Sequence, residues 1–347
     1  MPTAVYDNLI AAVRKHLPLF WDYLRFRRQT LGLPELQMYD VYVPLFPEGE
    51  SKYTYEQAKE LVLAAMAPLG AEYGRILAHG LADGWVDVYE NVGKTPGAYS
   101  SGIYDSDPYI LMNFQGNLNS VFTLAHELGH SLHSYFSCRE QPYIYSSYRI
   151  FVAEVASTVN ETLLTDYMLK QAKSDAERIA ILNYYLEQFR GTVFRQTMFA
   201  EFELRSHQTV EAGGILTAES LNDLYYGLNK DYFGQEIDAD PKIAMEWSRI
   251  PHFYRAFYVY KYATGFSAAQ ALALGMLDAD PAKAAAAQQR YLQFLAAGDS
   301  LEPIEALRLA GVDMASPQPV EAAMQIFRQR LGELQELLGR KSAKGGE

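Results

Sequence analysis

The sequence predicts a mainly helical protein with one small β-sheet. Apolar residues recur at helical spacing through most of the 347 residues, strand-like runs are few and short, and 49% of the residues are hydrophobic. A chain of this length can bury a sizeable core, and its only cysteine, Cys138, excludes an internal disulfide framework. We therefore expect a single domain over residues 1–340, followed by a disordered tail at 341–347.

The helices are predicted in chain order from apolar residues three and four apart. Residues 5–31 carry this pattern but are interrupted at Pro18, which predicts two helices. The same spacing predicts helices at residues 55–66, 176–209, 218–226, 281–297 and 320–338. Most of the chain is thereby assigned to helices.

The strands are predicted in three short segments, 39–43, 85–89 and 109–114. These segments are rich in aromatic and β-branched residues with near-alternating polarity. The connection between the last two, residues 94–102, is rich in glycine and serine and has turn chemistry. It is interpreted as either a plain loop or a mobile flap over a site.

The charge pattern limits the classes of partner. The formal net charge is −12 and no long basic run occurs, so a nucleic acid backbone would be repelled by most of the surface. No uncharged apolar stretch approaches the roughly 20 residues of a membrane span, and the N-terminal residues resemble neither a signal nor a transit peptide. With a single cysteine, these observations predict a cytoplasmic protein that binds neither nucleic acid nor membrane.

The most informative segment, residues 121–130, contains the pattern His126-Glu127-x-x-His130 on a predicted amphipathic helix. The spacing i, i+4 places the two imidazoles one above the other, so both can bind a single Zn²⁺ at about 2.0–2.1 Å. Glu127 lies about 100° round the helix from His126 and can reach a water beside the metal, which makes it the candidate general base. The alternative is a pair of ordinary surface histidines.

A third ligand is needed, and the residues offer different candidates. One known zinc-binding pattern has a histidine six residues after the second ligand, but that position is Phe136. His133 shares the face of His126 and His130, yet three ligands from one short helix would strain a tetrahedral site. Glu154 lies on a stripe of a second predicted helix and is the preferred ligand.

That stripe also carries Thr158, Glu161 and Thr165. Packed against the first helix, it brings a second acid, Glu161, within reach of an imidazole, which it can orient by a hydrogen bond. The alternative for Glu161 is an acid on an ordinary helix surface.

At these residues the sequence resembles the oligoendopeptidase F family, which belongs to the zinc peptidases that are similar to thimet oligopeptidase. The matching stretches are residues 97–102, 108–113, 122–135, 153–161 and 251–265. The resemblance implies a helical, gluzincin-type catalytic domain with one zinc ion per chain. It also implies His126, His130 and Glu154 as ligands and Glu127 as the catalytic base, although some descriptions of the family use a histidine at the position of His133.

The resemblance also points to a second group of residues near the C-terminal end of the matching region. Thimet-like enzymes stabilise the oxyanion with a histidine and downstream tyrosines, and the aromatic pattern places His252 and Tyr260 in these roles. Tyr254 and Tyr258 stay candidates because the spacing is shifted by a few residues. The alternative is an aromatic core stripe in a protein that has 26 tyrosines.

The implied activity is zinc-dependent hydrolysis of internal bonds in short oligopeptides. The strand at 109–114 precedes the metal helix, so its free edge is expected to bind the peptide main chain by strand addition. The residues assigned to substrate binding are Gly97, Tyr99, Tyr109 and Leu111.

Members of this family are usually near twice this length, and the N-terminal half that forms one wall of their substrate channel has no counterpart in this chain. An alternative function is therefore a non-catalytic or partner-dependent zinc-binding half that binds peptides but needs that N-terminal portion for turnover. Without that half, the surface against which it packs in the family is expected to be apolar and exposed, and self-association would be a further way to cover it. A second enzymatic alternative is a metallocarboxypeptidase, which would remove only single terminal residues.

Overall fold

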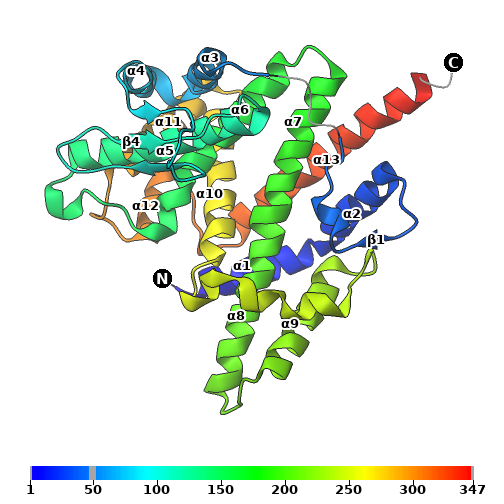
Figure 1. The fold of residues 1–347 in the computed structure, drawn as a ribbon. Helices are drawn as coiled ribbons and strands as arrows, with labels where there is room; N and C mark the ends of the chain where they lie inside the picture. Colours follow the sequence, from blue (N-terminus) through cyan, green and yellow to red (C-terminus); the bar gives the residue numbers. More distant parts are fainter. Residues whose placement is uncertain (1, 47–51, 345–347) are drawn as a thin grey trace. The chain divides into compact units, whose positions relative to one another are not determined.

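The computed structural model describes residues 2–46 and 52–344, and its packing divides the chain into two compact units. The first unit combines Glu50–Lys173 with Gly265–Pro319, and the second combines Pro2–Gly49, Ser174–Thr264 and Val320–Glu347. Because each unit is assembled from separate stretches of the chain, no single linker divides them. The predicted class, mainly helical with very little sheet, is confirmed (Figure 1).

The first unit is built around two long helices, α5 and α6, which pack along one another (Figure 1). Its helices are α3 (Tyr55–Ala65), α4 (Gly70–Ala82), α5 (Leu118–Glu140), α6 (Ala153–Gln171), α10 (Tyr260–Met276, in this unit from Gly265), α11 (Pro281–Ala296) and α12 (Pro303–Ala310), with 3₁₀ turns at Ala67–Leu69, Tyr143–Tyr145 and Ile150–Val152. Helices α3, α4 and α11 cover α5, so that Phe122, Leu128 and Leu132 are buried. The predicted apolar face of α5 therefore lies in the core.

A small sheet in the first unit has the strand order β2-β4-β3, formed by Val86–Asp87, Tyr109–Leu111 and Tyr99–Ser101. β4 pairs in parallel with β2 and antiparallel with β3, with Ser100 opposite Ile110. The expectation of a free edge on the strand at 109–114 is therefore wrong, because β4 is the central strand. The edge strands are β2 and β3, and β3 lies inside the segment that the sequence assigned to a loop or flap.

The loop before β3 is fastened to the strands on both sides. Lys94 Nζ donates to the carbonyl oxygens of Asp87 (3.0 Å) and Tyr89 (2.7 Å). Asn113 Nδ2 donates to the carbonyl oxygens of Thr95 (3.0 Å) and Gly97 (2.8 Å). These four hydrogen bonds hold residues 94–97 against the sheet.

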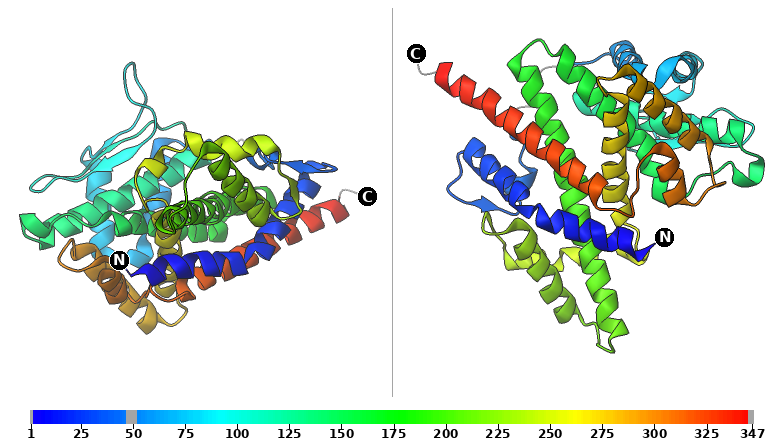
Figure 2. Two further views of the ribbon diagram at one scale, coloured as in Figure 1. Left: turned by 90° about the horizontal axis from the view of Figure 1, so that it is seen from below. Right: turned by 180° about the vertical axis from the view of Figure 1, so that it is seen from behind.

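The second unit is a separate helical assembly. It contains α1 (Thr3–Lys15), α2 (Leu17–Leu31), α7 (Asp175–Gln188), a π-helical segment (Phe189–Phe194), α8 (Arg195–Glu211), α9 (Ala218–Phe233) and α13 (Gln318–Lys344), with 3₁₀ segments at Asp40–Tyr42, Pro241–Arg249 and Pro251–Tyr254. Helix α13 passes beside α1 and α2 (Figure 2), where Lys15 pairs with Glu321 and the ring of Tyr23 contacts Phe327. A second, two-stranded sheet pairs β1 (Leu36–Gln37) in parallel with β5 (Ile237–Asp238). Residues 2–46 and 52–344 thus contain two small sheets, where the sequence predicted one.

The predicted strand at 39–43 is wrong, because residues 40–42 form a 3₁₀ turn. The buried side chain of Arg27 donates to the carbonyl oxygens of Asp40 (3.0 Å) and Val43 (2.6 Å), and the Asp40 carboxylate accepts from the Gln37 N–H at 2.8 Å. These contacts turn the chain and override the strand propensity of tyrosine and valine.

The predicted break near Pro18 falls at His16, and Pro18 lies in the first turn of α2, where its missing N–H costs nothing. At the other end, α13 continues to Lys344, so the first four residues of the predicted tail are helical. Residues 345–347 lie outside the described residues.

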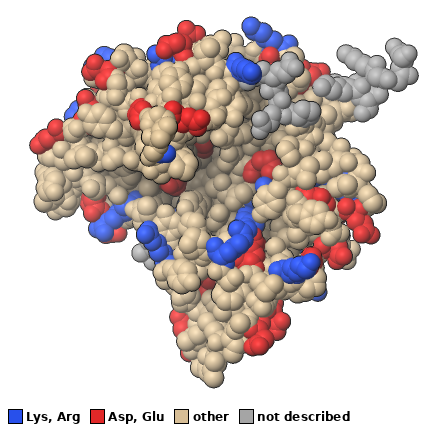
Figure 3. All heavy atoms as spheres, in the orientation of Figure 1, with Lys and Arg blue, Asp and Glu red and all other residues tan. Residues whose placement is uncertain are grey.

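Within the described residues, no single helix is long and apolar enough to cross a membrane. The pair Tyr55–Ala65 and Ala67–Ala82 meets the test of length and composition only when joined, with a 45° bend between them. On the face drawn in Figure 3, acidic and basic side chains are interspersed.

Candidate metal centre

The close approach of α5 and α6 is the feature from which the site is built. Gly129 makes it possible, since a Cβ at this position would lie only 2.5 Å from Ser157 Cα and 2.7 Å from the carbonyl oxygen of Ala156. Asn160, which is fully buried, donates from Nδ2 to the Ala125 carbonyl oxygen at 3.0 Å. A small residue in one helix and a buried amide in the other thus fix the distance and the register of the pair.

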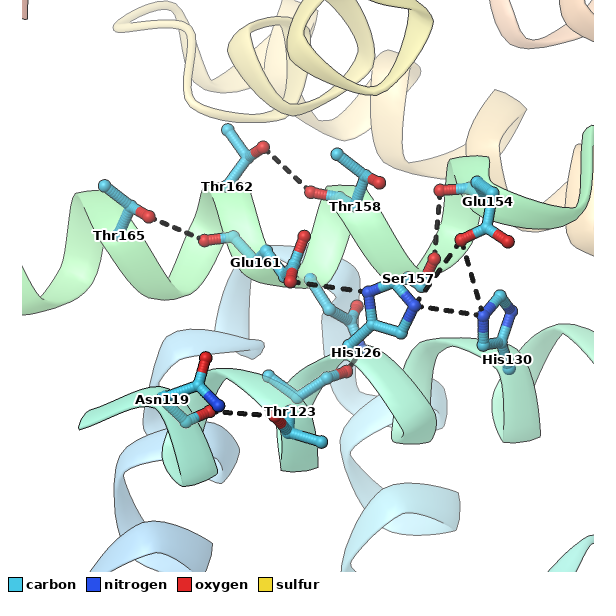
Figure 4. A network of polar contacts seen from close by, with 12 residues as sticks. Asn119, Thr123, His126, His130, Glu154, Ser157, Thr158, Glu161, Thr162 and Thr165 are labelled. Carbon is cyan, nitrogen blue, oxygen red and sulfur yellow. Dashed lines mark hydrogen bonds and ion pairs between the residues drawn. The ribbon is translucent and has the colours of Figure 1, made fainter. Parts of the chain in front are cut away.

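Three donor atoms converge where the two helices meet (Figure 4). His126 Nε2 and His130 Nε2, one turn apart on α5, are 3.2 Å from each other. Glu154 Oε2, in the first turn of α6, lies 3.5 Å from His126 Nε2 and 3.7 Å from His130 Nε2. The structure therefore brings together the three residues that the sequence singled out as ligands.

The triangle formed by these atoms matches the dimensions of a zinc site. A tetrahedral ion at about 2.0–2.1 Å from each ligand requires ligand atoms about 3.3 Å apart, and the three distances are within a few tenths of an ångström of this value. Two imidazoles and one carboxylate are also a donor set that zinc accepts in catalytic sites, where one position stays open. The residues present fit a zinc ion.

The electrostatics of the donor set favour a bound cation. Burial opposes the charged form of His126, but Glu161 and Glu154 outweigh it and raise its pKa well above its ordinary value. Burial and the nearby His126 both lower the pKa of His130. The two carboxylates thus stabilise positive charge among the donor atoms, as they would the charge of a bound metal ion.

Glu161 contacts the far side of the same imidazole. Its Oε1 lies 3.3 Å from His126 Nδ1, so the carboxylate can hold the ring with Nε2 facing His130 and Glu154 (Figure 4). On the stripe of α6 indicated by the spacing, the carboxylates of Glu154 and Glu161 point toward His126 on α5 (Figure 4), and Thr158 and Thr165 are buried.

Glu127 points to another side of α5, toward the sheet. Its side chain is buried, and burial raises the pKa of its carboxyl group, while the backbone N–H of Ser100 in β3 hydrogen-bonds to it. Ser100 Oγ is also 2.8 Å from Ser131 Oγ, one turn further along α5. The carboxylate therefore lies beside the free edge of β3. A raised pKa suits a general base that works near neutral pH.

His133 lies in the interior and outside the cluster of three donors. Its ring stacks on Tyr148 with centroids 3.7 Å apart and an interplanar angle of 1°, and it contacts Phe294 at 5.2 Å. Burial lowers the pKa of His133 to about 3, so the imidazole is neutral. Its shared stripe on α5 made His133 a candidate ligand, but the ring faces aromatic neighbours.

The residues assigned to substrate binding occupy the sheet and the loop before it. Tyr99 and Tyr109 are half exposed, and by the register of β3 and β4 they lie on the face opposite Ser100 and Ile110, together with Leu111. Gly97, which has a φ of +92°, lines a cavity of about 720 Å³ together with Asn113 and, from the N-terminal part of α5, Asn119 and Thr123. These residues border the start of the metal helix.

The aromatic segment with His252 belongs to the second unit. Tyr262 Oη lies 3.4 Å from His252 Nε2, and the ring of Tyr258 is 5.7 Å from the imidazole. Tyr254 is 89% exposed, whereas Tyr260 is buried against Tyr6 with centroids 4.8 Å apart. Tyr262 was not singled out from the sequence, although it lies in the same aromatic run.

The residues that sequence reasoning missed reach the site through long-range packing. Ser100 and Tyr148 come from a strand and a loop that carry no metal-binding pattern. In the sequence, Ser100 is one serine of the segment at 94–102, and Tyr148 is a tyrosine six residues before Glu154. Neither can be identified without the pairing of β3 or the stacking on His133.

Comparison with known proteins gives a consistent set of relatives. The model of "Peptidase family M3" matches residues 1–326. The chain is similar to oligopeptidase PepF of Bacillus subtilis, with 54% identity over 97% of this chain and 50% of that protein, and to an oligoendopeptidase F homolog of Lactococcus lactis, with 45% identity over 97% and 55%. Its structure is similar to the crystal structure of oligoendopeptidase-F from Enterococcus faecium, with a TM-score of 0.76 and 41% identity over 98% of this chain and 54% of that chain. The chain spans about half the length of the curated relatives it matches.

Proposed function

The chain belongs to peptidase family M3, and from this premise we propose that it is a zinc-dependent endopeptidase portion that hydrolyses internal bonds of short oligopeptides. The observation that carries the proposal is the triangle of His126 Nε2, His130 Nε2 and Glu154 Oε2, with sides of 3.2, 3.5 and 3.7 Å, next to the buried carboxyl group of Glu127. Its dimensions suit one zinc ion per chain.

The roles proposed for the residues follow from their positions. A zinc ion held by His126, His130 and Glu154 would supply a Lewis acid that polarises the peptide carbonyl and makes a water molecule more acidic. Glu127 takes a proton from the attacking water and later passes it to the leaving amine. Glu161 orients the imidazole of His126, as its 3.3 Å contact with Nδ1 supports.

The proposed position of the peptide is along β3, the edge strand that contacts Glu127. Such a peptide would pass next to Glu127, whose carboxyl group accepts a hydrogen bond from the backbone N–H of Ser100. Strand addition recognises the main chain, so we expect broad sequence tolerance with mild preferences from nearby side chains. Gly97, Tyr99, Tyr109 and Leu111 are proposed to set those preferences.

Stabilisation of the oxyanion by His252 and a tyrosine is proposed on the strength of the family resemblance. Within the second unit, the contacts of His252 with Tyr258 and Tyr262 support a shared role for these side chains. Replacing each of Tyr254, Tyr258 and Tyr260 by phenylalanine ranks them, because only the donor's variant should lose kcat with KM unchanged.

The alternative function is a zinc-binding half that binds peptides and depends on a further portion, or on a second copy of the chain, for turnover. The observation that favours it is the coverage of only half of each curated relative. A cytoplasmic location is likewise a proposal, supported by the single cysteine.

The deciding experiment is cleavage of an internally quenched peptide of about eight residues by the purified chain, with mass spectrometry of the fragments. We expect internal cuts that stop with a chelator and return with zinc, and Glu127→Gln should keep zinc but lose hydrolysis by several orders of magnitude. Zinc-bound but inactive wild-type protein would favour the dependent half. Release of single terminal residues only would identify an exopeptidase, and full activity of Glu127→Gln would exclude this residue as the base.

A further inference from the structure

Tyr148 is a tyrosine of the first unit that the proposed function leaves without a role. It lies in the loop between the 3₁₀ turns Tyr143–Tyr145 and Ile150–Val152, six residues before Glu154. Its ring is stacked on the imidazole of His133 with the planes parallel to within 1°. Because His133 is fully buried and also contacts Phe294, the stack fixes the plane and position of the phenol.

The hydroxyl group of Tyr148 lies at the metal-binding face of α5. Its oxygen is 3.2 Å from Ser134 Oγ, and Ser134 follows His130 by four residues, on the same stripe as His126 and His130. One helical turn, about 5.4 Å along the axis, therefore separates the partner of this hydroxyl from a metal ligand.

The end of β3 reaches the same place. A Cβ at Gly102, the residue after β3, would overlap with the side chain of Ser134, so the backbone there runs directly against α5. The Tyr148 hydroxyl thus lies near the point where the free-edge strand meets the metal-binding face. A peptide that extends β3 would pass this point with its backbone.

The surroundings keep the hydroxyl in its donor form. Burial raises the pKa of Tyr148, and the negative charges of Glu154 and Glu127 raise it further. At neutral pH the phenol retains its hydrogen and can donate it to an oxygen.

We propose that the Tyr148 hydroxyl donates a hydrogen bond to the carbonyl oxygen of the peptide bond under attack, and that His133 is a positioning residue that holds the phenol by stacking. The inference rests on the proposed peptidase function. On this account Ser134 holds the hydroxyl when no peptide is bound, and the donor moves to the carbonyl oxygen as negative charge develops there. The first unit would then carry an oxyanion donor of its own.

Tyr148→Phe is the test, because it removes the hydroxyl and keeps the ring on His133. The zinc-loaded full chain and its variant are compared for zinc content, thermal unfolding, kinetics and calorimetric binding of a peptide phosphinate, whose charged oxygens resemble the oxyanion. We expect unchanged zinc content and unfolding temperature, a loss of about 10- to 100-fold in kcat, KM within about twofold, and phosphinate affinity reduced by a similar factor. Tyr145→Phe, in the 3₁₀ turn that precedes this loop, is the matched control and should change none of these values.

If the wild-type protein binds the phosphinate but does not hydrolyse peptides, phosphinate affinity alone still tests the proposal. Equal phosphinate affinity in Tyr148→Phe and wild type would overturn the proposal, whereas absence of both zinc and phosphinate binding in wild type would overturn the proposed function itself. If the Tyr148→Phe variant does not fold, 3-fluorotyrosine at position 148 provides the same test. Its hydroxyl is more acidic, so a hydrogen bond from it to the phosphinate must alter the affinity. His133→Phe separates the two roles of the histidine: retained zinc supports positioning, and lost zinc would make His133 a ligand.

Discussion

Replacing Gly129 by alanine should weaken zinc binding, although the residue is not a ligand. The added Cβ would lie 2.5 Å from Ser157 Cα, whereas ordinary contacts begin near 3.4 Å, so the helices must separate by about 0.9 Å. The obstacle is backbone, which cannot turn away as a flexible side chain would. Because Glu154 is attached to the displaced helix, its distances of 3.5 and 3.7 Å to the histidines would approach about 4.5 Å, too long for one tetrahedral site.

The expected change in the free energy of unfolding follows from two opposing effects. Alanine in place of glycine stabilises a helix interior by about 1 kcal/mol, and overpacking of a close contact costs about 1–3 kcal/mol. Gly74→Ala is the matched control, since Gly74 lies in α4 of the same unit with open space around it. Both variants share the helix gain, so Gly129→Ala should be less stable than Gly74→Ala by about 1–3 kcal/mol in urea unfolding.

Zinc affinity is the second measurement, by competition with a chromophoric chelator. We expect a loss of about 100-fold for Gly129→Ala, the upper end of the effects seen when a ligand loses its support, and no change for Gly74→Ala. Equal zinc affinity in the two variants would refute the idea that the close approach of α5 and α6 sets the position of Glu154.

Three further predictions concern single contacts. Glu161→Gln should lower zinc affinity about tenfold by weakening the hold on His126, while Asp166→Asn on the same helix should leave it unchanged in the same chelator competition; equal losses would exclude an orienting role. Burial would raise the pKa of Glu246, but Arg195 and Tyr225 outweigh it and lower the pKa, whereas burial raises the pKa of Glu203. In urea unfolding at a series of pH values, Glu246→Gln should be less stable than wild type above about pH 4.5, and this difference should vanish as the pH falls through the lowered pKa. Glu203→Gln should gain stability relative to wild type as the pH rises above about 4.5. If the unfolding free energies of wild type and variants change in parallel with pH, both signs are contradicted. Lys94→Met should free the loop at 94–97 and speed its amide hydrogen exchange, with no change in the exchange of α11 as the internal reference.

The metal-binding candidates could be predicted from the sequence because their geometry is local. The spacing of His126 and His130 places their rings together in any α-helix, and the stripe of Glu154 and Glu161 follows from the same periodicity in a second helix. The sequence also predicts the helical class, since the segments 176–209, 218–226 and 281–297 that apolar spacing assigns to helices are helical in the structure to within one residue at their ends. These features depend on neighbours three and four residues away.

The features that could not be predicted depend on distant partners. The order β2-β4-β3 makes β4 the central strand and leaves β2 and β3 at the edges, and nothing in residues 99–101 shows that β4 has a neighbour on each side. The segment at 39–43 has the composition of a strand but is turned by Arg27 from another element. The position of Tyr148 follows only from its stacking on His133.

The most direct test of the account is the coordination of zinc in the purified, metal-loaded chain, measured by X-ray absorption at the zinc edge. We predict two imidazole nitrogens and one carboxylate oxygen at about 2.0–2.2 Å with a further light atom, and loss of an oxygen ligand in Glu154→Ala. A third imidazole, or a spectrum that Glu154→Ala leaves unchanged, would contradict the assignment of His126, His130 and Glu154 as the metal centre.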